Sequence, residues 1–163
     1  MCEKLFRGKR IDNGEWVEGC GIIATENWVS IFTVNDDIDE NSSEVNEIEV
    51  LPETVGQYTG LTVANGKVFN GDIIRFGNKL YLVFWNGEAF QWQAKRIDTD
   101  LEIHRTCGGC HNFDWTITDL GLIAAEPVLI GEMTTEIIGN KWDNPELLTR
   151  SKGRCNNAAD EFF

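Results

Sequence analysis

The chain has 163 residues, of which 42% are hydrophobic, and a formal net charge of −13. A chain of this length fits one domain, and its core is large enough to fold without a disulfide or a metal ion. The charge argues against direct binding to nucleic acid, because phosphates require Lys and Arg to displace counterions. Membrane insertion is not expected either, because no apolar run approaches the ~20 residues of a span.

The negative charge is concentrated in one block. Between Ile11 and Gly66 the chain has no Lys and no Arg. The acidic block has two possible roles. It forms a surface that keeps the protein soluble, or a surface that competes with DNA or RNA for a basic protein partner. The block holds twelve carboxylates: Asp12, Glu15, Glu18, Glu26, Asp36, Asp37, Asp39, Glu40, Glu44, Glu47, Glu49 and Glu53.

The N-terminal sequence and the cysteines bear on the compartment. Residues 1–7 contain charged side chains with no apolar stretch behind them, so we expect no signal peptide and a cytoplasmic location. The chain has five cysteines, an odd number. In a cytoplasmic protein we expect these to be thiols.

The first predicted elements form a β-hairpin. Segments 5–11 and 16–23 are rich in strand formers and flank Asn13-Gly14, a pair that tolerates the positive φ of tight hairpin turns. Gly19 and Gly21 predict a bend or bulge where strands cross closely. The next predicted elements are a strand over 28–34, a polar loop over 35–43 and a short strand over 48–51 that ends at Pro52.

In the second half of the chain, Asn-Gly pairs again separate short predicted strands. Asn70-Gly71 and Asn86-Gly87 mark two further turns. A helix is predicted to start with Asn144 as N-cap and Pro145 at its first position. The predicted elements are strands over 67–69, 72–76, 79–85, 88–94 and 136–139, an irregular segment over 96–120, and a weakly ordered tail over 151–163.

Aromatic residues gather on the hairpin predicted around Asn86-Gly87. They are Tyr81, Phe84, Trp85, Phe90 and Trp92. Core packing and cross-strand pairing explain such residues. A ligand-binding aromatic face is the alternative.

An ordered set of short motifs runs along the chain. The motifs are Leu5-Phe6-Arg7-Gly8-Lys9-Arg10, Asn13-Gly14-Glu15-Trp16-Val17-Glu18-Gly19, the run from Val50 to Leu61, Gly71-Asp72-Ile73-Ile74, Ile138-Gly139-Asn140, and the run from Asp143 to Leu148. Together they make this sequence similar to the YopX family, small proteins encoded by bacteriophages and prophages. The resemblance implies a mainly β fold that contains an SH3-like barrel, and it brings no catalytic residues with it.

We therefore expect a single mostly-β domain over residues 1–150. Its SH3-like barrel would run from about 51 to 97, with the N-terminal hairpin and the last strand packed on it and a short helix at the end. Turn capping and barrel hydrogen bonds account for the polar members of the family-like motifs at least as well as a binding site does. The motif residues are Pro52, Glu53, Thr54, Gly56, Gln57, Tyr58, Gly60, Gly71 and Asp72.

A cysteine–histidine loop is the strongest chemical feature. Cys107 and Cys110 are separated by two glycines, and His104 and His111 flank them. The pattern suits part of a zinc site, but the second pair of ligands that a complete site needs is lacking. Haem attachment needs export, and a redox dithiol needs a neighbouring βαβ unit. We expect free thiols that are metal-free or only partly occupied by metal after purification in a chelator-free buffer.

Other chemistry has little support in the sequence. Both histidines lie in that one loop, and there is no Gly-x-Ser-x-Gly elbow or phosphate-binding glycine loop. The acidic pairs Asp36-Asp37 and Asp98 with Asp100 lack the spacing of a calcium loop. We expect no cofactor and no catalytic activity.

Three functional hypotheses follow. The first is a non-enzymatic interaction protein that a phage or prophage directs at a host or phage protein. The second is an acidic mimic of nucleic acid that occupies a basic DNA- or RNA-binding protein. The third, ranked last, is a metalloprotein or enzyme built on the Cys107 and Cys110 loop. A homo-oligomer is also open, because exposed strand edges invite pairing.

Overall fold

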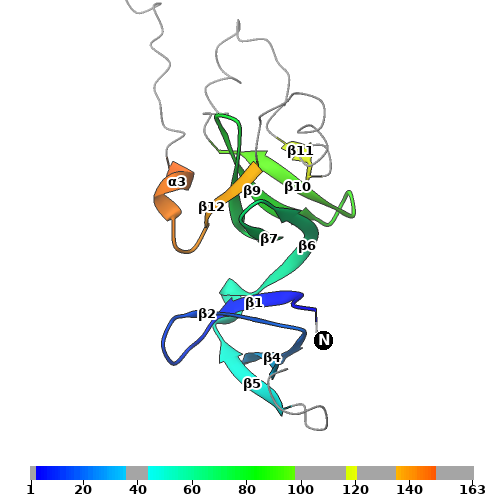
Figure 1. The fold of residues 1–163 in the computed structure, drawn as a ribbon, viewed down its shortest axis with the longest axis vertical. Helices are drawn as coiled ribbons and strands as arrows, with labels where there is room; N and C mark the ends of the chain where they lie inside the picture. The colour runs from blue at the N-terminus through cyan, green and yellow to red at the C-terminus, as the bar shows by residue number, and fades with distance from the viewer. Residues whose placement is uncertain (1–2, 36–43, 98–116, 121–134, 150–163) are drawn as a thin grey trace, which may run out of the picture. The chain divides into compact units, whose positions relative to one another are not determined.

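The computed structural model describes residues 3–35, 44–97, 117–120 and 135–149 (Figure 1). Strands joined by tight turns dominate these residues, and a short α-helix, α3 (Pro145–Thr149), follows the last strand. The predicted mainly β class with a short C-terminal helix is confirmed. The chain divides into two compact units, Met1–Asn70 and Gly71–Phe163. The assignment of residues 1–150 to a single domain stays a prediction.

The first unit is built from two antiparallel sheets. One has four strands in the order β2-β1-β6-β7, and the other has three in the order β3-β4-β5. A short 3₁₀ turn, η1 (Pro52–Thr54), leads from β5 into β6. The strands are β1 (Phe6–Lys9), β2 (Trp16–Gly19), β3 (Gly21–Ala24), β4 (Val29–Asn35), β5 (Glu44–Val50), β6 (Gly56–Val63) and β7 (Gly66–Phe69).

The predicted N-terminal hairpin is confirmed, but its second strand is shorter than expected. β1 pairs with β2 from Phe6 opposite Gly19 to Lys9 opposite Trp16. After Gly19 the chain leaves this sheet, and β3 pairs with β4 instead. A side chain at Gly19 would overlap the carbonyl oxygen of Phe32. The prediction of a close crossing is therefore confirmed at Gly19, whereas a side chain at Gly21 would make only ordinary contacts with Phe32.

Two strands of this unit differ from prediction. β5 begins at Glu44 rather than at residue 48, because its polar first half pairs with β4 along the full length, as far as Asn35 opposite Glu44. β6 was not predicted, since its glycines weaken the strand signal. Gly60 has a φ of +88°, and the register with β7 shifts between Tyr58 and Thr62.

Apolar side chains from both sheets form the core of this unit. Val29, Ile31 and Val50 are buried at its centre. Partly buried hydrophobic residues pack against these three: Phe6, Val17, Ile22 and Val55. Both strands of the hairpin thus contribute to the core through the same face, as the period of two requires.

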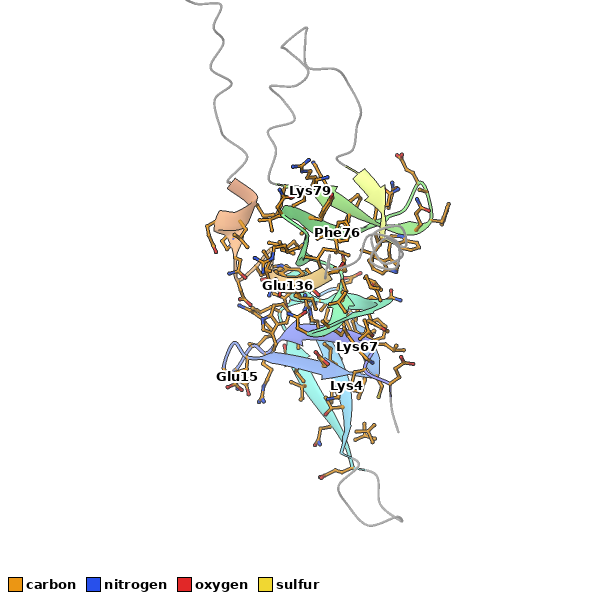
Figure 2. The ribbon with its side chains drawn as sticks, turned by 45° about the horizontal axis from the view of Figure 1, so that its top comes forward. Lys4, Glu15, Lys67, Phe76, Lys79 and Glu136 are labelled. Carbon is orange, nitrogen blue, oxygen red and sulfur yellow. The ribbon has the colours of Figure 1, made fainter. Side chains whose placement is uncertain are left out.

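The second unit has one antiparallel sheet in the order β11-β10-β9-β8-β12. Ile73, Ile74, Val83 and Ala94 are fully buried in it. Phe76 and Lys79, labelled in Figure 2, end β8 and begin β9 on either side of a tight turn. The strands are β8 (Asp72–Phe76), β9 (Lys79–Asn86), β10 (Gln91–Arg96), β11 (Ile117–Asp119) and β12 (Thr135–Asn140).

The hairpin of β9 and β10 (green in Figure 1) has a longer loop than predicted. Asn86 lies opposite Gln91, so residues 87–90 form a four-residue loop in place of a two-residue turn at Asn86-Gly87. The side-chain oxygen of Asn86 accepts the N–H groups of Glu88 and Ala89, at 3.0 and 3.2 Å. The positive φ falls on Phe90, at +51°, and not on Gly87.

Two further predictions meet the structure only in part. Residues 117–119, which were predicted to be irregular, form β11 beside β10. The strands of the predicted barrel, from 51 to 97, belong to two sheets: β6 and β7 to one, and β8, β9 and β10 to the other. The SH3-like barrel stays a prediction. The loop predicted over 35–43 lies outside the described residues except for its first residue, which ends β4. The tail predicted over 151–163 lies wholly outside them.

Candidate functional site

The family-like motif around Pro52 joins η1 to β1. The hydroxyl of Thr54, which is buried, accepts the backbone N–H of Lys9 at 2.9 Å and donates to the carbonyl of Leu51 at 2.7 Å. One side chain thus closes the turn and fixes it to a strand 45 positions earlier. Pro52 and Glu53 are exposed beside it.

The rest of this motif packs against β7. A side chain at Gly56 would lie 2.7 Å from the carbonyl oxygen of Asn70, so only glycine allows this approach. The rings of Tyr58 and Phe69 lie 5.8 Å apart at 53°. Gln57 and Gly60 are exposed. These contacts give the motif a structural part in holding β6 in place.

Cations and aromatic rings alternate along the four-stranded sheet. The guanidinium carbon of Arg7 lies 4.8 Å from the ring centroid of Trp16 and 4.9 Å from that of Phe69. The ammonium of Lys9 lies 5.6 Å from the Trp16 ring. Lys67, labelled in Figure 2, lies 4.8 Å from the ring of Tyr58 and donates to the carbonyl of Lys4 at 3.4 Å. Contacts of this kind stabilise by about 0.5–1 kcal/mol each at exposed sites.

This arrangement has an electrostatic consequence. Arg10, a fourth basic side chain, hydrogen-bonds Asp12 through two nitrogens, at 2.9 and 2.5 Å, and this hydrogen bond lowers the pKa of Asp12. Most basic side chains of the first unit are therefore engaged with rings or with Asp12. The carboxylates of Glu18, Glu47 and Glu49 are left exposed.

Gly71 begins the second unit under two constraints. Its φ is +87°, and a side chain there would lie 2.5 Å from the ring of Trp142. Its N–H donates to the carbonyl of Val83 and its carbonyl accepts the N–H of Lys141, both at 2.9 Å. The next residue, Asp72, is fully buried and lies opposite Asn140 in the pairing of β8 with β12.

The turn between β12 and α3 is held by its own amide side chains. The side-chain oxygen of Asn140 accepts the N–H groups of Trp142 and Asp143, at 3.0 and 2.9 Å. The Asn144 side chain accepts the N–H of Asn140 at 3.3 Å, and the Asn144 carbonyl accepts the N–H of Leu147 at 3.1 Å. The predicted helix start at Asn144-Pro145 is confirmed. The side-chain oxygen of Asn144, predicted to cap the helix, bonds the N–H of Asn140 within the turn.

Among the described residues of the second unit, the aromatic hairpin carries the large hydrophobic side chains that are exposed. Tyr81 is buried, in agreement with the core interpretation. Trp85 and Trp92 face each other across the strands, with ring centroids 5.2 Å apart at 68°, yet Trp85 is 47% exposed. Phe90, at the end of the loop, is 81% exposed. Core packing therefore accounts for Tyr81 and cross-strand pairing for Trp85 and Trp92, while the ligand-binding face stays a prediction.

The predicted zinc candidates lie outside the described residues, namely His104, Cys107, Cys110 and His111. The same holds for Asp36, Asp37, Asp98 and Asp100. Within the described part of the chain, no group of three or more His, Cys, Asp or Glu side chains could hold a metal ion.

Cys20 corrects the prediction that all cysteines are thiols. It is disulfide-bonded. The sequence pattern could not indicate this bond, because pairing depends on which cysteines the fold brings together.

A comparison with protein-family models gives a match over most of the chain. The family model described as YopX protein matches residues 5–149. No curated protein matches the chain. None of the helices within the described ranges has the length and apolar composition needed to cross a membrane.

Proposed function

Since this chain belongs to the YopX family, we propose that it is a non-enzymatic interaction protein, encoded by a phage or prophage and acting in the bacterial cytoplasm. Its partner is a host or phage protein. The observation that carries this proposal is the aromatic loop of the β9–β10 hairpin, defined as residues 87–90 with Trp85 and Trp92 beside them.

The loop presents a large apolar side chain at a conformational cost. Phe90 is 81% exposed, so it contributes little to folding. Its φ of +51° is a left-handed conformation, which costs a residue with a side chain about 1–2 kcal/mol. Stability alone would favour Gly or Asn at this position. A strained and exposed aromatic residue is the combination that binding sites retain.

The loop is also fixed before any partner arrives. Asn86 caps two backbone N–H groups of the loop, and its side-chain nitrogen donates to the Gln93 side chain at 2.8 Å. The paired rings of Trp85 and Trp92 support its base. A pre-ordered loop loses less conformational entropy on binding.

Affinity capture with matched variants tests this proposal. Wild-type protein, Phe90→Asn and Glu88→Gln would each be incubated with host lysate, and the captured proteins quantified by mass spectrometry. We expect a protein that is captured by wild type and by Glu88→Gln, and at least about tenfold less by Phe90→Asn. Equal capture by all three proteins would show that the loop is not part of the binding site.

A second candidate function is the acidic mimic of nucleic acid. The outward carboxylates of Glu47 and Glu49 on β5 support it, together with those of Glu15 and Glu18 on the β1–β2 hairpin. A mimic occupies the phosphate-binding surface of its partner, so duplex DNA or RNA should displace it. If nucleic acid competes with the captured partner and Phe90→Asn does not affect capture, the second candidate replaces the first.

A further inference from the structure

The three-stranded sheet ends in a strand edge that is paired over only part of its length. Along the last residues of β5 (cyan in Figure 1), the chain segment after β1 lies beside it. The N–H of Ile11 donates to the carbonyl of Glu49 at 3.2 Å, and the N–H of Leu51 donates to the carbonyl of Lys9 at 2.8 Å. Arg10 and Val50 form the bridge between these bonds. Beyond Ile11 the chain turns away through Asp12.

The first five residues of β5 are open on this side. Glu49 bonds outward from the sheet, and groups two residues apart point the same way, so the backbone N–H and C=O groups of Glu47 and Val45 also face this edge. Among the described residues, none hydrogen-bonds to these groups. Val45 is 59% exposed, and Glu47 is exposed as well. A row of such groups is a template for a further strand.

The negative charge of the glutamates on β5 determines which kind of strand can pair with its open edge. Glu44, Glu47 and Glu49 are all exposed on β5, and no Lys or Arg lies between Ile11 and Gly66. A second copy of β5 would place carboxylates opposite carboxylates, which destabilises a cross-strand pair. A strand that carries lysine would place opposite charges across the new pairing.

We infer that the open edge of β5, from Glu44 to Ile48, binds a lysine-bearing extended segment of a protein partner as an added strand. Main-chain hydrogen bonds to Val45 and Glu47 supply the register, and the glutamates supply the preference for lysine. This surface differs from the aromatic loop, so the inference and the proposed function stand or fall separately.

Synthetic peptides in which lysine alternates with valine test the inference. One peptide is unmodified, and two are N-methylated on alternate residues, in the two possible registers. In a strand, alternate N–H groups face opposite sides, so one of the methylated peptides loses every N–H that could reach β5. By isothermal titration calorimetry we expect the unmodified peptide to bind, and one methylated register to bind at least about tenfold more weakly than the other.

Matched charge variants locate the site. Glu47→Lys should weaken the unmodified peptide, while Glu26→Lys, the same change in the turn between β3 and β4 of the same sheet, should not. In amide exchange, the N–H groups of Val45 and Glu47 should become protected on peptide addition. The variant Phe90→Asn should bind the peptide as wild type does. The inference would be overturned if the unmodified peptide did not bind. Equal binding of both methylated registers, or equal weakening by Glu47→Lys and Glu26→Lys, would also overturn it, because charge attraction alone would then explain the binding.

Discussion

At the scale of single residues, Gly71 shows how backbone geometry and packing restrict one position together. Its φ of +87° disfavours any side chain, and the ring of Trp142 occupies the space that a side chain would need. Gly60 has nearly the same φ, +88°, but nothing lies within 4 Å of its side-chain position. The two glycines therefore separate the conformational cost from the packing cost.

We expect Gly60→Ala to destabilise by about 1–2 kcal/mol, the cost of the left-handed conformation alone. Gly71→Ala should cost clearly more, because Trp142 must also move. Thermal melts of the two variants measure the difference, at about 2–4 °C per kcal/mol for a chain of this size. Equal shifts in melting temperature would mean that the Trp142 contact contributes nothing.

Thr54 provides the second prediction at this scale. Thr54→Val keeps the shape and removes the hydroxyl, which leaves the partly buried N–H of Lys9 and the carbonyl of Leu51 without this partner. Such a loss costs about 1–3 kcal/mol. Thr62→Val is the control, because its hydroxyl bonds only the Tyr58 hydroxyl on an exposed surface. Urea titration should place Thr54→Val well below both wild type and the control, and coinciding curves would contradict the role assigned to this hydroxyl.

At the scale of elements, the β9–β10 hairpin combines a stable base with a strained loop. Trp85 and Trp92 pair across the strands, and such aromatic pairs stabilise by about 0.5–1.5 kcal/mol. Phe90 opposes this through its positive φ. An element that gives up stability at one exposed position is consistent with the binding role proposed for its loop.

The strain can be measured without a partner. Phe90→Asn places a residue that tolerates the left-handed region in the loop, whereas Phe90→Ala keeps the conformational cost. Both remove the exposed ring. We expect the asparagine variant to melt above the alanine variant by a few degrees, and not below wild type. If alanine is equal or better, the positive φ of Phe90 stores no strain.

At the scale of the whole molecule, the net charge leads to a prediction about nucleic-acid binding. With a net charge of −13, the protein should not bind duplex DNA or RNA at physiological salt, because binding depends on basic residues that displace counterions from phosphates. A gel shift at about 150 mM salt should show no complex at micromolar protein. A complex tighter than about 10⁻⁶ M would contradict both this expectation and the mimic hypothesis.

The disulfide of Cys20 gives the second prediction at this scale. Peptide mapping of protein purified without reductant should find the Cys20 peptide linked to a second cysteine peptide, and reduction should separate them. A reducing cytoplasm opposes such bonds. Protein alkylated before cell lysis should therefore carry the label on Cys20 if the proposed location is correct. A Cys20 peptide that is free in all samples would contradict the bond itself.

Several elements could be predicted from the sequence because their causes are local. Asn-Gly at residues 13–14 and 70–71 marked turns where glycine takes a positive φ. Asn144-Pro145 marked the start of α3, since the fixed φ of Pro145 favours the first helical position. The alternation of apolar residues gave most strands, and the ordered motifs indicated the family.

The candidate sites depended on contacts that the sequence pattern does not contain. Phe90 carries the positive φ in place of Gly87 because pairing of Asn86 with Gln91 sets the loop length. The open edge of β5 exists because the chain after β1 covers only the last part of that strand. Both features result from hydrogen bonding between chain segments that are separate in the sequence.

By itself, the sequence determined the mainly β class, the turns, the helix start, the acidic balance and the family, because each follows from residues adjacent in the chain or from their number. Only the tertiary structure decided which sheet each strand joins, that Arg7 lies between the rings of Trp16 and Phe69, and that Cys20 is bonded. The sheet orders and the contact of Arg7 with Phe69 join residues far apart in the chain. Their geometry is fixed by the packing of whole strands, which no local pattern specifies.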